Sequence, residues 1–211
     1  MISSQEEKRV RASRSAPPLY FLRHGETDWN AVGRLQGRKD IPLNALGREQ
    51  AARAGRKLHK ILAARGADAA AVGFQCSPLE RTRKTMEIVR AELGLPREGS
   101  VFDDRLVEFT FGRWEGLTWP EVCAKDPELA RAREADKWNF VPPGGESYAE
   151  LAVRLKPWVE AQDAPSVVVS HGGVARVLMA MLGGLAASRA PMADIWQGRV
   201  LVFSEGRFDW I

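Results

Sequence analysis

Cysteine is scarce in this sequence, with only Cys76 and Cys123 among 211 residues. The two are far apart and lack the spacing of metal ligands. A chain of this length can bury roughly 70% of its unfolded surface, so it needs no disulfide or structural metal to fold. We therefore expect two reduced thiols, as in a cytoplasmic protein.

Long apolar runs are missing as well. No stretch reaches the 18 or so apolar residues that suggest a membrane-spanning helix. The nearest candidate, Val177–Ala187, is shorter and is typical of a buried helix. The N-terminus also lacks the apolar segment of a secretory signal. The sequence predicts no membrane association and a cytoplasmic location.

The excess of positive charge is small, because 31 Lys and Arg face 27 Asp and Glu, for a net charge of +4. Half of that excess lies within residues 1–16, which are polar and precede Pro17-Pro18. This composition predicts a disordered N-terminal tail before a single domain over 17–211. A nucleic-acid-binding protein needs a denser basic stripe on its folded part, so we expect no nucleic-acid partner. A modest excess of arginine suits a pocket for small anions.

From residue 19 onward, strand-like and helix-like segments alternate. The predicted strands cover 19–22, 69–76, 166–170, 199–204 and 207–211. The predicted helices cover 44–65, 78–93, 127–140 and 172–182, with further helix starts at the capping boxes of Thr118 and Ser147. The buried face of the first helix is expected to carry Leu46, Ala54, Leu58, Ile61 and Leu62. The order predicts an α/β fold, a three-layer sandwich whose mostly parallel central sheet is flanked by helices, with a small helical cap over about 109–150.

Two of the three histidines follow apolar strands and precede glycine, at His24-Gly25 and His171-Gly172. In open α/β sheets, ligands bind beyond the carboxyl ends of the strands. A histidine there, beside a glycine that permits close backbone approach, suits a phosphate pocket. The histidines alone favour two structural side chains at strand ends, so the residues around them must decide. The third histidine, His59, lies on a basic helix and is expected to be exposed.

The residues around these histidines form motifs in a set order. Arg23-His24-Gly25-Glu26-Thr27, followed by Trp29-Asn30, resembles the signature of the histidine phosphatase superfamily, also called phosphoglycerate mutase-like. The similarity continues through Gly33–Gly37, Asp40–Leu43, Ser77–Thr85, Leu106–Glu108, Phe111–Gly116, Pro143–Ser147 and Val169–Gly173. It covers about residues 19–182.

The resemblance implies a role for each matching residue. His24 would be the nucleophile that forms a phosphohistidine, and it must attack as neutral imidazole. Arg23, Arg81 and His171 would bind the phosphoryl oxygens, since guanidinium groups both position and stabilise a phosphoryl group in transfer. Further phosphate or substrate contacts are implied for Asn30, Gln36, Gly37 and the backbone N–H of Gly172. No metal and no other cofactor are expected.

Glu108 would be the general acid that protonates the leaving oxygen and then the base that activates water. This role requires a raised pKa. We expect apolar Phe109, Phe111 and Trp114 to favour that shift and the arginines to oppose it, with bound phosphate tipping the balance. Glu115, in the same region, is expected to be structural.

The resemblance is compatible with two reactions, and a third possibility is a protein without catalytic activity. A phosphatase gives the phosphoryl group to water, whereas a phosphoglycerate mutase returns it to a bound sugar acid. Arg38-Lys39-Asp40 lacks the Gly-Trp pair usual in the mutases, and the segment between Glu108 and Pro143 is short, so a phosphatase is preferred. A non-catalytic binding protein is disfavoured because no catalytic group is missing. The expected partner is a small phosphorylated metabolite, and a homodimer is left open.

The cap should select the leaving group, although the sequence does not identify it. Trp29 and Trp138 either line the mouth of the pocket or pack in the core. The other candidates in or near the cap are Phe109, Phe111, Trp114, Trp119, Phe140, Arg131, Arg133 and Lys137.

Overall fold

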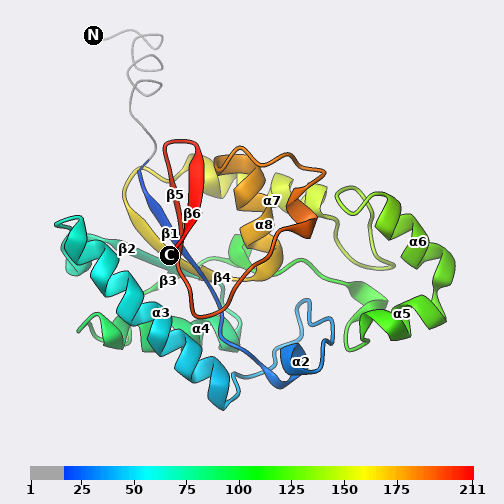
Figure 1. Cartoon of the computed structure of the whole chain (residues 1–211), viewed down its shortest axis with the longest axis horizontal. Helices are drawn as coiled ribbons and strands as arrows, with labels where there is room; N and C mark the ends of the chain where they lie inside the picture. Colours follow the sequence, from blue (N-terminus) through cyan, green and yellow to red (C-terminus); the bar gives the residue numbers. More distant parts are fainter. Residues whose placement is uncertain (1–16) are drawn as a thin grey trace, which may run out of the picture.

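The computed structural model describes residues 17–211, so the tail predicted over residues 1–16 lies outside the described residues. A six-stranded sheet forms the centre (Figure 1), in the order β3-β2-β4-β1-β5-β6. Its parallel strands are β3 (Val101–Phe102), β2 (Gly73–Cys76), β4 (Ser166–Ser170) and β1 (Leu19–Arg23). The antiparallel strands β5 (Leu201–Ser204) and β6 (Arg207–Trp210) complete one edge.

The two central strands are buried on both faces, which explains their nearly continuous apolar sequences. Along β1, Tyr20 and Leu22 face one side of the sheet, while Leu19 and Phe21 face the other. This alternation divides the interior into two cores, one on each face.

Helices cover both faces of the sheet. On the side of Tyr20 and Leu22 lie α3 (Ala45–Ala64) and α4 (Glu80–Glu92), which contact each other closely. On the opposite side lie α7 (Tyr148–Glu160) and α8 (Gly172–Leu182). The predicted three-layer α/β arrangement with a mostly parallel sheet is therefore confirmed. No helix within residues 17–211 has both the length and the apolar character needed to cross a membrane.

The segment expected to act as a cap carries its own small apolar cluster. It contains α5 (Trp119–Lys125) and α6 (Pro127–Ala135), which lie to one side of the sheet in Figure 1. Trp114 is fully buried there, and its indole N–H donates a hydrogen bond to Asp126 at 2.7 Å. Phe140 stacks on the same indole, with ring centroids 5.6 Å apart. Trp114 thus stabilises the cap itself.

Local signals placed most helix starts correctly. Asn44 caps α3, and the capping boxes at Thr118 and Ser147 begin α5 and α7. A third capping box, at Thr27, begins the short helix α2 (Asp28–Ala31) and was not predicted. The C-terminal hairpin turns at Glu205-Gly206 as expected, with both residues at positive φ.

Two predicted boundaries and one predicted core residue were wrong. The strand expected over 69–76 begins only at Gly73, because the Asp68 side chain accepts from Ala70 N–H and starts a 3₁₀ turn. The helix expected over 127–140 ends at Ala135, where Asp136 instead accepts two hydrogen bonds from Asn139. Leu46 lies in the first turn of α3 but is 44% exposed, so it is not part of the buried face.

Candidate active site

The parallel pairing of β1 and β4 brings the two strand-end histidines together. Arg23 lies opposite Ser170 in the register, and the His24 N–H donates to the Ser170 carbonyl at 2.9 Å. The ring centroids of His24 and His171 are 5.3 Å apart. Residues separated by almost 150 positions therefore share one edge of the sheet, as the strand-end argument predicted.

His24 is held in one tautomer. Its Nδ1 lies 2.7 Å from the Gly25 carbonyl, which can only accept, so Nδ1 carries the proton and Nε2 keeps its lone pair. Burial lowers the pKa of His24 well below its ordinary value, and the charges of Arg81 and Arg23 lower it further. His24 is therefore a neutral imidazole whose free nitrogen can act as a nucleophile.

His171 caps the N-terminus of α8 and is fully buried. Its Nε2 lies 2.8 Å from the Ser77 hydroxyl, while its Nδ1 has no hydrogen-bond partner. Burial, followed by the charge of Arg81, lowers the pKa of this histidine well below its ordinary value. Ser77 follows β2, so three neighbouring strand ends meet at this point.

Two arginines reach the same place from different elements. Arg23 ends β1 and donates from Nη1 to the Ile195 carbonyl at 2.9 Å, and burial lowers its pKa to about 10. Arg81, in the first turn of α4, donates to the carbonyls of Lys39 and Gly37 at 2.6 and 2.8 Å. Burial also lowers the pKa of Arg81. Both guanidinium groups are fixed by backbone carbonyls rather than by carboxylates.

The hydrogen bonds that these side chains do not make are informative. Five buried side-chain atoms within residues 17–211 have no partner, and four of them belong to predicted site residues. These four are Arg23 Nε, Arg81 Nε, His171 Nδ1 and Gln36 Oε1. Buried polar atoms normally have partners, and an orphan requires an explanation. The two guanidinium Nε–H groups are charged donors, which oxygen atoms of an anion would satisfy.

Glu108 follows the 3₁₀ turn Asp104–Leu106 and points at the N-terminus of α8. Its Oε2 accepts from the Gly173 N–H at 3.0 Å, and its Oε1 accepts from the Phe109 N–H at 3.2 Å. Burial raises the pKa of Glu108, although these hydrogen bonds and the charges of Arg81 and Arg176 oppose the shift.

Burial therefore outweighs the arginines without any substrate, which corrects our expectation that bound phosphate tips the balance. Trp114 does not contribute as expected, because it packs inside the cap. Glu115 is structural, as expected: its Oε1 accepts hydrogen bonds from the Thr110 hydroxyl and from the N–H groups of Arg38 and Phe111.

The remaining predicted contacts lie around one pocket of about 220 Å³. Asn30 accepts from Gln197 and from the Thr27 N–H through Oδ1, which leaves its Nδ2 as a donor. Gln36, Gly37 and Gly172 also line the pocket, together with Arg23, His24, Arg81 and Glu108. His171 is not part of the lining and lies behind it, against the ring of His24.

Two further side chains of this pocket lie outside the motifs recognised in the sequence. Arg176 lies four residues after Gly172, on the same face of α8, and its Nε donates to the Ala193 carbonyl at 3.0 Å. Tyr148 directly follows the Ser147 cap and is buried. The helical spacing could have revealed Arg176, but nothing local distinguishes Tyr148 from a core residue.

Several aromatic and basic residues considered for the pocket lie elsewhere. Trp29 packs against Gly116, and Trp138 stacks on Tyr148 at 6.0 Å, so neither lines the mouth. Of the aromatic and basic cap residues named as candidates, only Phe109 and Phe111 belong to the pocket. Arg133 lies over the Trp119 ring, and Lys137 pairs with Glu134. Within residues 17–211, no group of three or more His, Cys, Asp or Glu is arranged to hold a metal ion.

Comparison with known proteins agrees with the order of these motifs. The family model of the histidine phosphatase superfamily (branch 1) matches residues 19–209. The chain belongs to the histidine phosphatase superfamily. The match extends beyond the motifs recognised in the sequence and includes the C-terminal hairpin. The resemblance on which the predicted site residues depend is thereby confirmed at the level of the family.

Relatives in this superfamily include phosphatases and mutases. A glucosyl-3-phosphoglycerate phosphatase of Mycolicibacterium vanbaalenii is 36% identical over 82% of this chain and 77% of its own length. A 2,3-bisphosphoglycerate-dependent phosphoglycerate mutase of Methylobacterium sp. is 30% identical over 88% of this chain and 89% of its own length. The structure of mycobacterial glucosyl-3-phosphoglycerate phosphatase with VO₃ has a TM-score of 0.74 at 29% identity, covering 93% of this chain and 97% of that one.

Proposed function

We propose that this chain is a metal-independent phosphomonoester hydrolase that acts through a phosphohistidine on a small phosphorylated metabolite. The observation that carries the proposal is the set of orphaned nitrogens. Arg23 Nε and Arg81 Nε lack partners around His24, a neutral histidine whose Nε2 is free. A tetrahedral phosphoryl group offers the oxygens that such donors require.

In the first step, Nε2 of His24 attacks the phosphorus, and the bond between phosphorus and the ester oxygen breaks. The leaving oxygen takes the proton of Glu108, whose burial favours the protonated form. The guanidinium groups of Arg23 and Arg81 stabilise the charge on the phosphoryl oxygens. The Nδ1–H of His24 stays bonded to the Gly25 carbonyl, which keeps the ring oriented throughout.

In the second step, the ionised Glu108 takes a proton from water while the water oxygen attacks phosphorus. The bond between phosphorus and Nε2 breaks, which releases inorganic phosphate and restores neutral His24 and protonated Glu108. All charge stabilisation comes from protein groups in this scheme. The aromatic walls of Phe109, Phe111 and Tyr148 would hold the organic part of the substrate.

Product analysis with a substrate panel tests this proposal. The panel would contain glucosyl-3-phosphoglycerate and 3-phosphoglycerate, which the names of the relatives suggest, and sugar, nucleotide and aryl phosphates. Free phosphate and isomerised phosphoglycerate would be followed separately, with EDTA present, and with and without bisphosphoglycerate. We expect free phosphate from several substrates and no turnover by His24→Ala. The matched control is His59→Ala, because His59 is exposed on α3.

Two results would contradict the proposal. Isomerised phosphoglycerate with little free phosphate would identify a mutase. No turnover of any substrate would favour a binding protein on this scaffold. An acid-labile, alkali-stable phosphoryl group on the wild-type protein, absent from His24→Ala, would support the covalent intermediate.

A further inference from the structure

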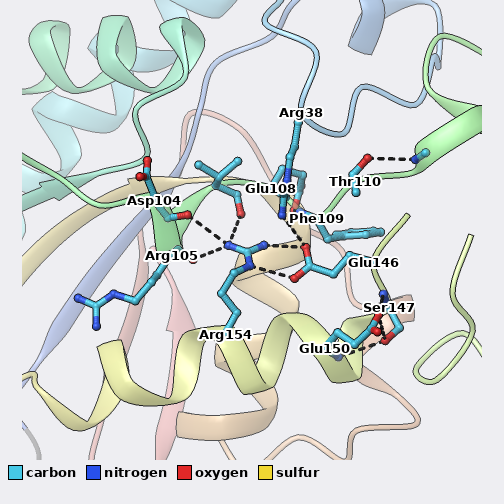
Figure 2. Close-up of polar contacts among 12 residues, drawn as sticks. Arg38, Asp104, Arg105, Glu108, Phe109, Thr110, Glu146, Ser147, Glu150 and Arg154 are labelled. Atoms are coloured by element: carbon cyan, nitrogen blue, oxygen red, sulfur yellow. Dashed lines mark hydrogen bonds and ion pairs between the residues drawn. The ribbon is translucent and has the colours of Figure 1, made fainter. Parts of the chain in front are cut away.

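The backbone that carries Glu108 is held by two arginines joined through one carboxylate (Figure 2). Arg154, on α7, forms a two-pronged ion pair with Glu146, from Nε and Nη2, at 2.9 Å each. The same carboxylate accepts from Arg38 Nη2 at 3.1 Å. We name this chain of contacts the Arg38–Glu146–Arg154 bridge.

Both ends of the bridge contact the backbone segment that leads to Glu108. Arg154 Nη1 donates to the carbonyls of Arg105 and Val107 at 2.7 and 3.0 Å, with a longer contact of 3.5 Å to Asp104. Arg38 Nε donates to the backbone carbonyl of Glu108 itself at 3.2 Å. The bridge therefore contacts the carbonyls of four of the five residues from 104 to 108.

The bridge also reaches the phosphate-binding side of the pocket. Arg38 lies between Gly37 and Lys39, whose carbonyls accept from Arg81. The Glu146 N–H donates to the Thr110 carbonyl at 2.9 Å, two residues beyond the acid. Arg38 therefore links the segment that carries Glu108 to the loop whose carbonyls hold Arg81.

Burial makes the Glu146–Arg154 part of the bridge stiffer than a surface ion pair, whereas the Arg38 side chain is 48% exposed. The Glu146 side chain is 14% exposed and that of Arg154 is 20% exposed. Exposed ion pairs contribute little, whereas two-pronged, partly buried pairs fix geometry. Proton transfer in a pocket depends on placement, and an error of about 1 Å can reduce rates by about 100-fold.

We propose that Arg38, Glu146 and Arg154 are positioning residues for Glu108, which set the distance between its carboxyl group and the phosphate held by Arg81. This inference rests on the proposed function, in which Glu108 is the acid. None of the three residues takes part in a chemical step. They act by setting the position from which Glu108 transfers its proton to the leaving oxygen.

The leaving-group dependence of kcat/KM separates this role from a general structural one. An aryl phosphate such as 4-nitrophenyl phosphate leaves with little protonation, whereas an alkyl phosphate needs the acid. The comparison uses kcat/KM, because later hydrolysis of the phosphohistidine is common to both substrates. The variants are Glu146→Gln, Arg154→Met and Arg38→Met, with Arg154→Lys as the conservative change.

We expect kcat/KM for the alkyl ester to fall by about tenfold or more in Glu146→Gln and Arg154→Met, and by about threefold or less for the aryl ester. Arg154→Lys should recover part of the loss. The matched control is Arg56→Met, which breaks the Arg56–Glu92 ion pair of 3.1 Å between α3 and α4. That variant should leave the ratio of the two rates unchanged.

Two outcomes would overturn the inference, and they differ from failure of the proposed function. The bridge would be merely structural if kcat/KM fell equally for both esters and the fall followed a drop in Tm. The same conclusion would hold if kcat/KM fell for neither ester. Glu108→Gln provides the reference, since it should lower the alkyl rate selectively. If Glu108→Gln leaves the ratio unchanged, the acid assignment fails and the positioning role fails with it. If Glu108→Gln changes the ratio and the bridge variants do not, only the positioning role is wrong.

Discussion

The carboxyl group of Glu108 lies against the first turn of α8, where its Oε2 accepts a hydrogen bond from the Gly173 N–H at 3.0 Å. A backbone donor at a helix N-terminus stabilises the ionised carboxylate, whereas burial favours the protonated form. Burial prevails and raises the pKa of Glu108. In the proposed reaction Glu108 donates a proton in one step and accepts one in the next. Opposing effects on its pKa keep both the protonated and the ionised form accessible.

Gly173→Ala should therefore impair proton transfer. A Cβ at this position would overlap both Glu108 Oε1 and the ring of Phe109. We expect kcat/KM for an alkyl phosphate to fall by about tenfold or more, because the carboxyl must shift. The control is Gly73→Ala in β2, where the nearest atom to a new Cβ is 3.6 Å away. Unchanged activity in Gly173→Ala would show that Glu108 tolerates displacement.

Arg81→Lys should damage catalysis although the charge is kept. Arg81 is 1% exposed and uses two nitrogens for the Gly37 and Lys39 carbonyls, with Nε left over. An ammonium group carries its three donors on one atom, so it cannot reproduce the planar fork that reaches both carbonyls and a phosphoryl oxygen. Losing a charge-assisted hydrogen bond of about 2–3 kcal/mol predicts a fall in kcat/KM of about 30- to 150-fold.

The matched variant for this prediction is Arg83→Lys. Arg83 lies two residues further along α4 and is exposed. Steady-state kinetics of this variant should match the wild type. Similar losses in both variants would mean that the Arg81 contacts are not the cause.

The buried histidines should make the protein less stable as the pH falls. The pKa of His24 is well below its ordinary value in the folded protein, so the unfolded chain binds a proton first. Unfolding is therefore favoured as the pH drops below about 6.5, by up to about 1.4 kcal/mol per pH unit for each such histidine. The effect is absent above that pH, where neither state is protonated.

His24→Asn should remove one of these contributions, and its amide can still donate to the Gly25 carbonyl. Urea unfolding between pH 7 and 5 should show a shallower fall in the free energy of unfolding than in the wild type. Glu108 acts with the opposite sign, because its raised pKa disfavours the folded state as the pH rises. Its contribution is present in both proteins and cancels in the difference. Identical slopes would contradict the assignment of a neutral, buried His24.

The two cysteines should differ sharply in reactivity. Cys76 is buried at the end of β2, and burial raises its pKa to about 12. Cys123 is exposed on α5. Iodoacetamide at pH 8 should modify the folded protein once, at Cys123, without loss of phosphatase activity, because the thiolate is the reactive form. Mass spectrometry of the wild type and Cys123→Ser checks this, and modification at Cys76 would contradict it.

The sequence alone determined the alternation of strands and helices, the helix caps and the candidate residues. β1 and β4 were predictable because both faces are buried, which leaves an uninterrupted apolar run. The caps at Asn44, Thr118 and Ser147 were predictable because a cap depends on residues three positions apart. His24 and His171 could be paired because parallel strands end at the same edge.

Only the tertiary structure decided how those residues act together. The sequence near Trp29 and Trp138 does not show whether these side chains line a pocket or pack in the core. The packing of the folded chain places both outside the pocket. Arg176 and Tyr148 enter it because α8 and α7 lie on the same face of the sheet. The raised pKa of Glu108 arises from burial, which depends on contacts between distant segments. The Arg38–Glu146–Arg154 bridge spans more than 100 residues, and such contacts form only when helices pack on the completed sheet.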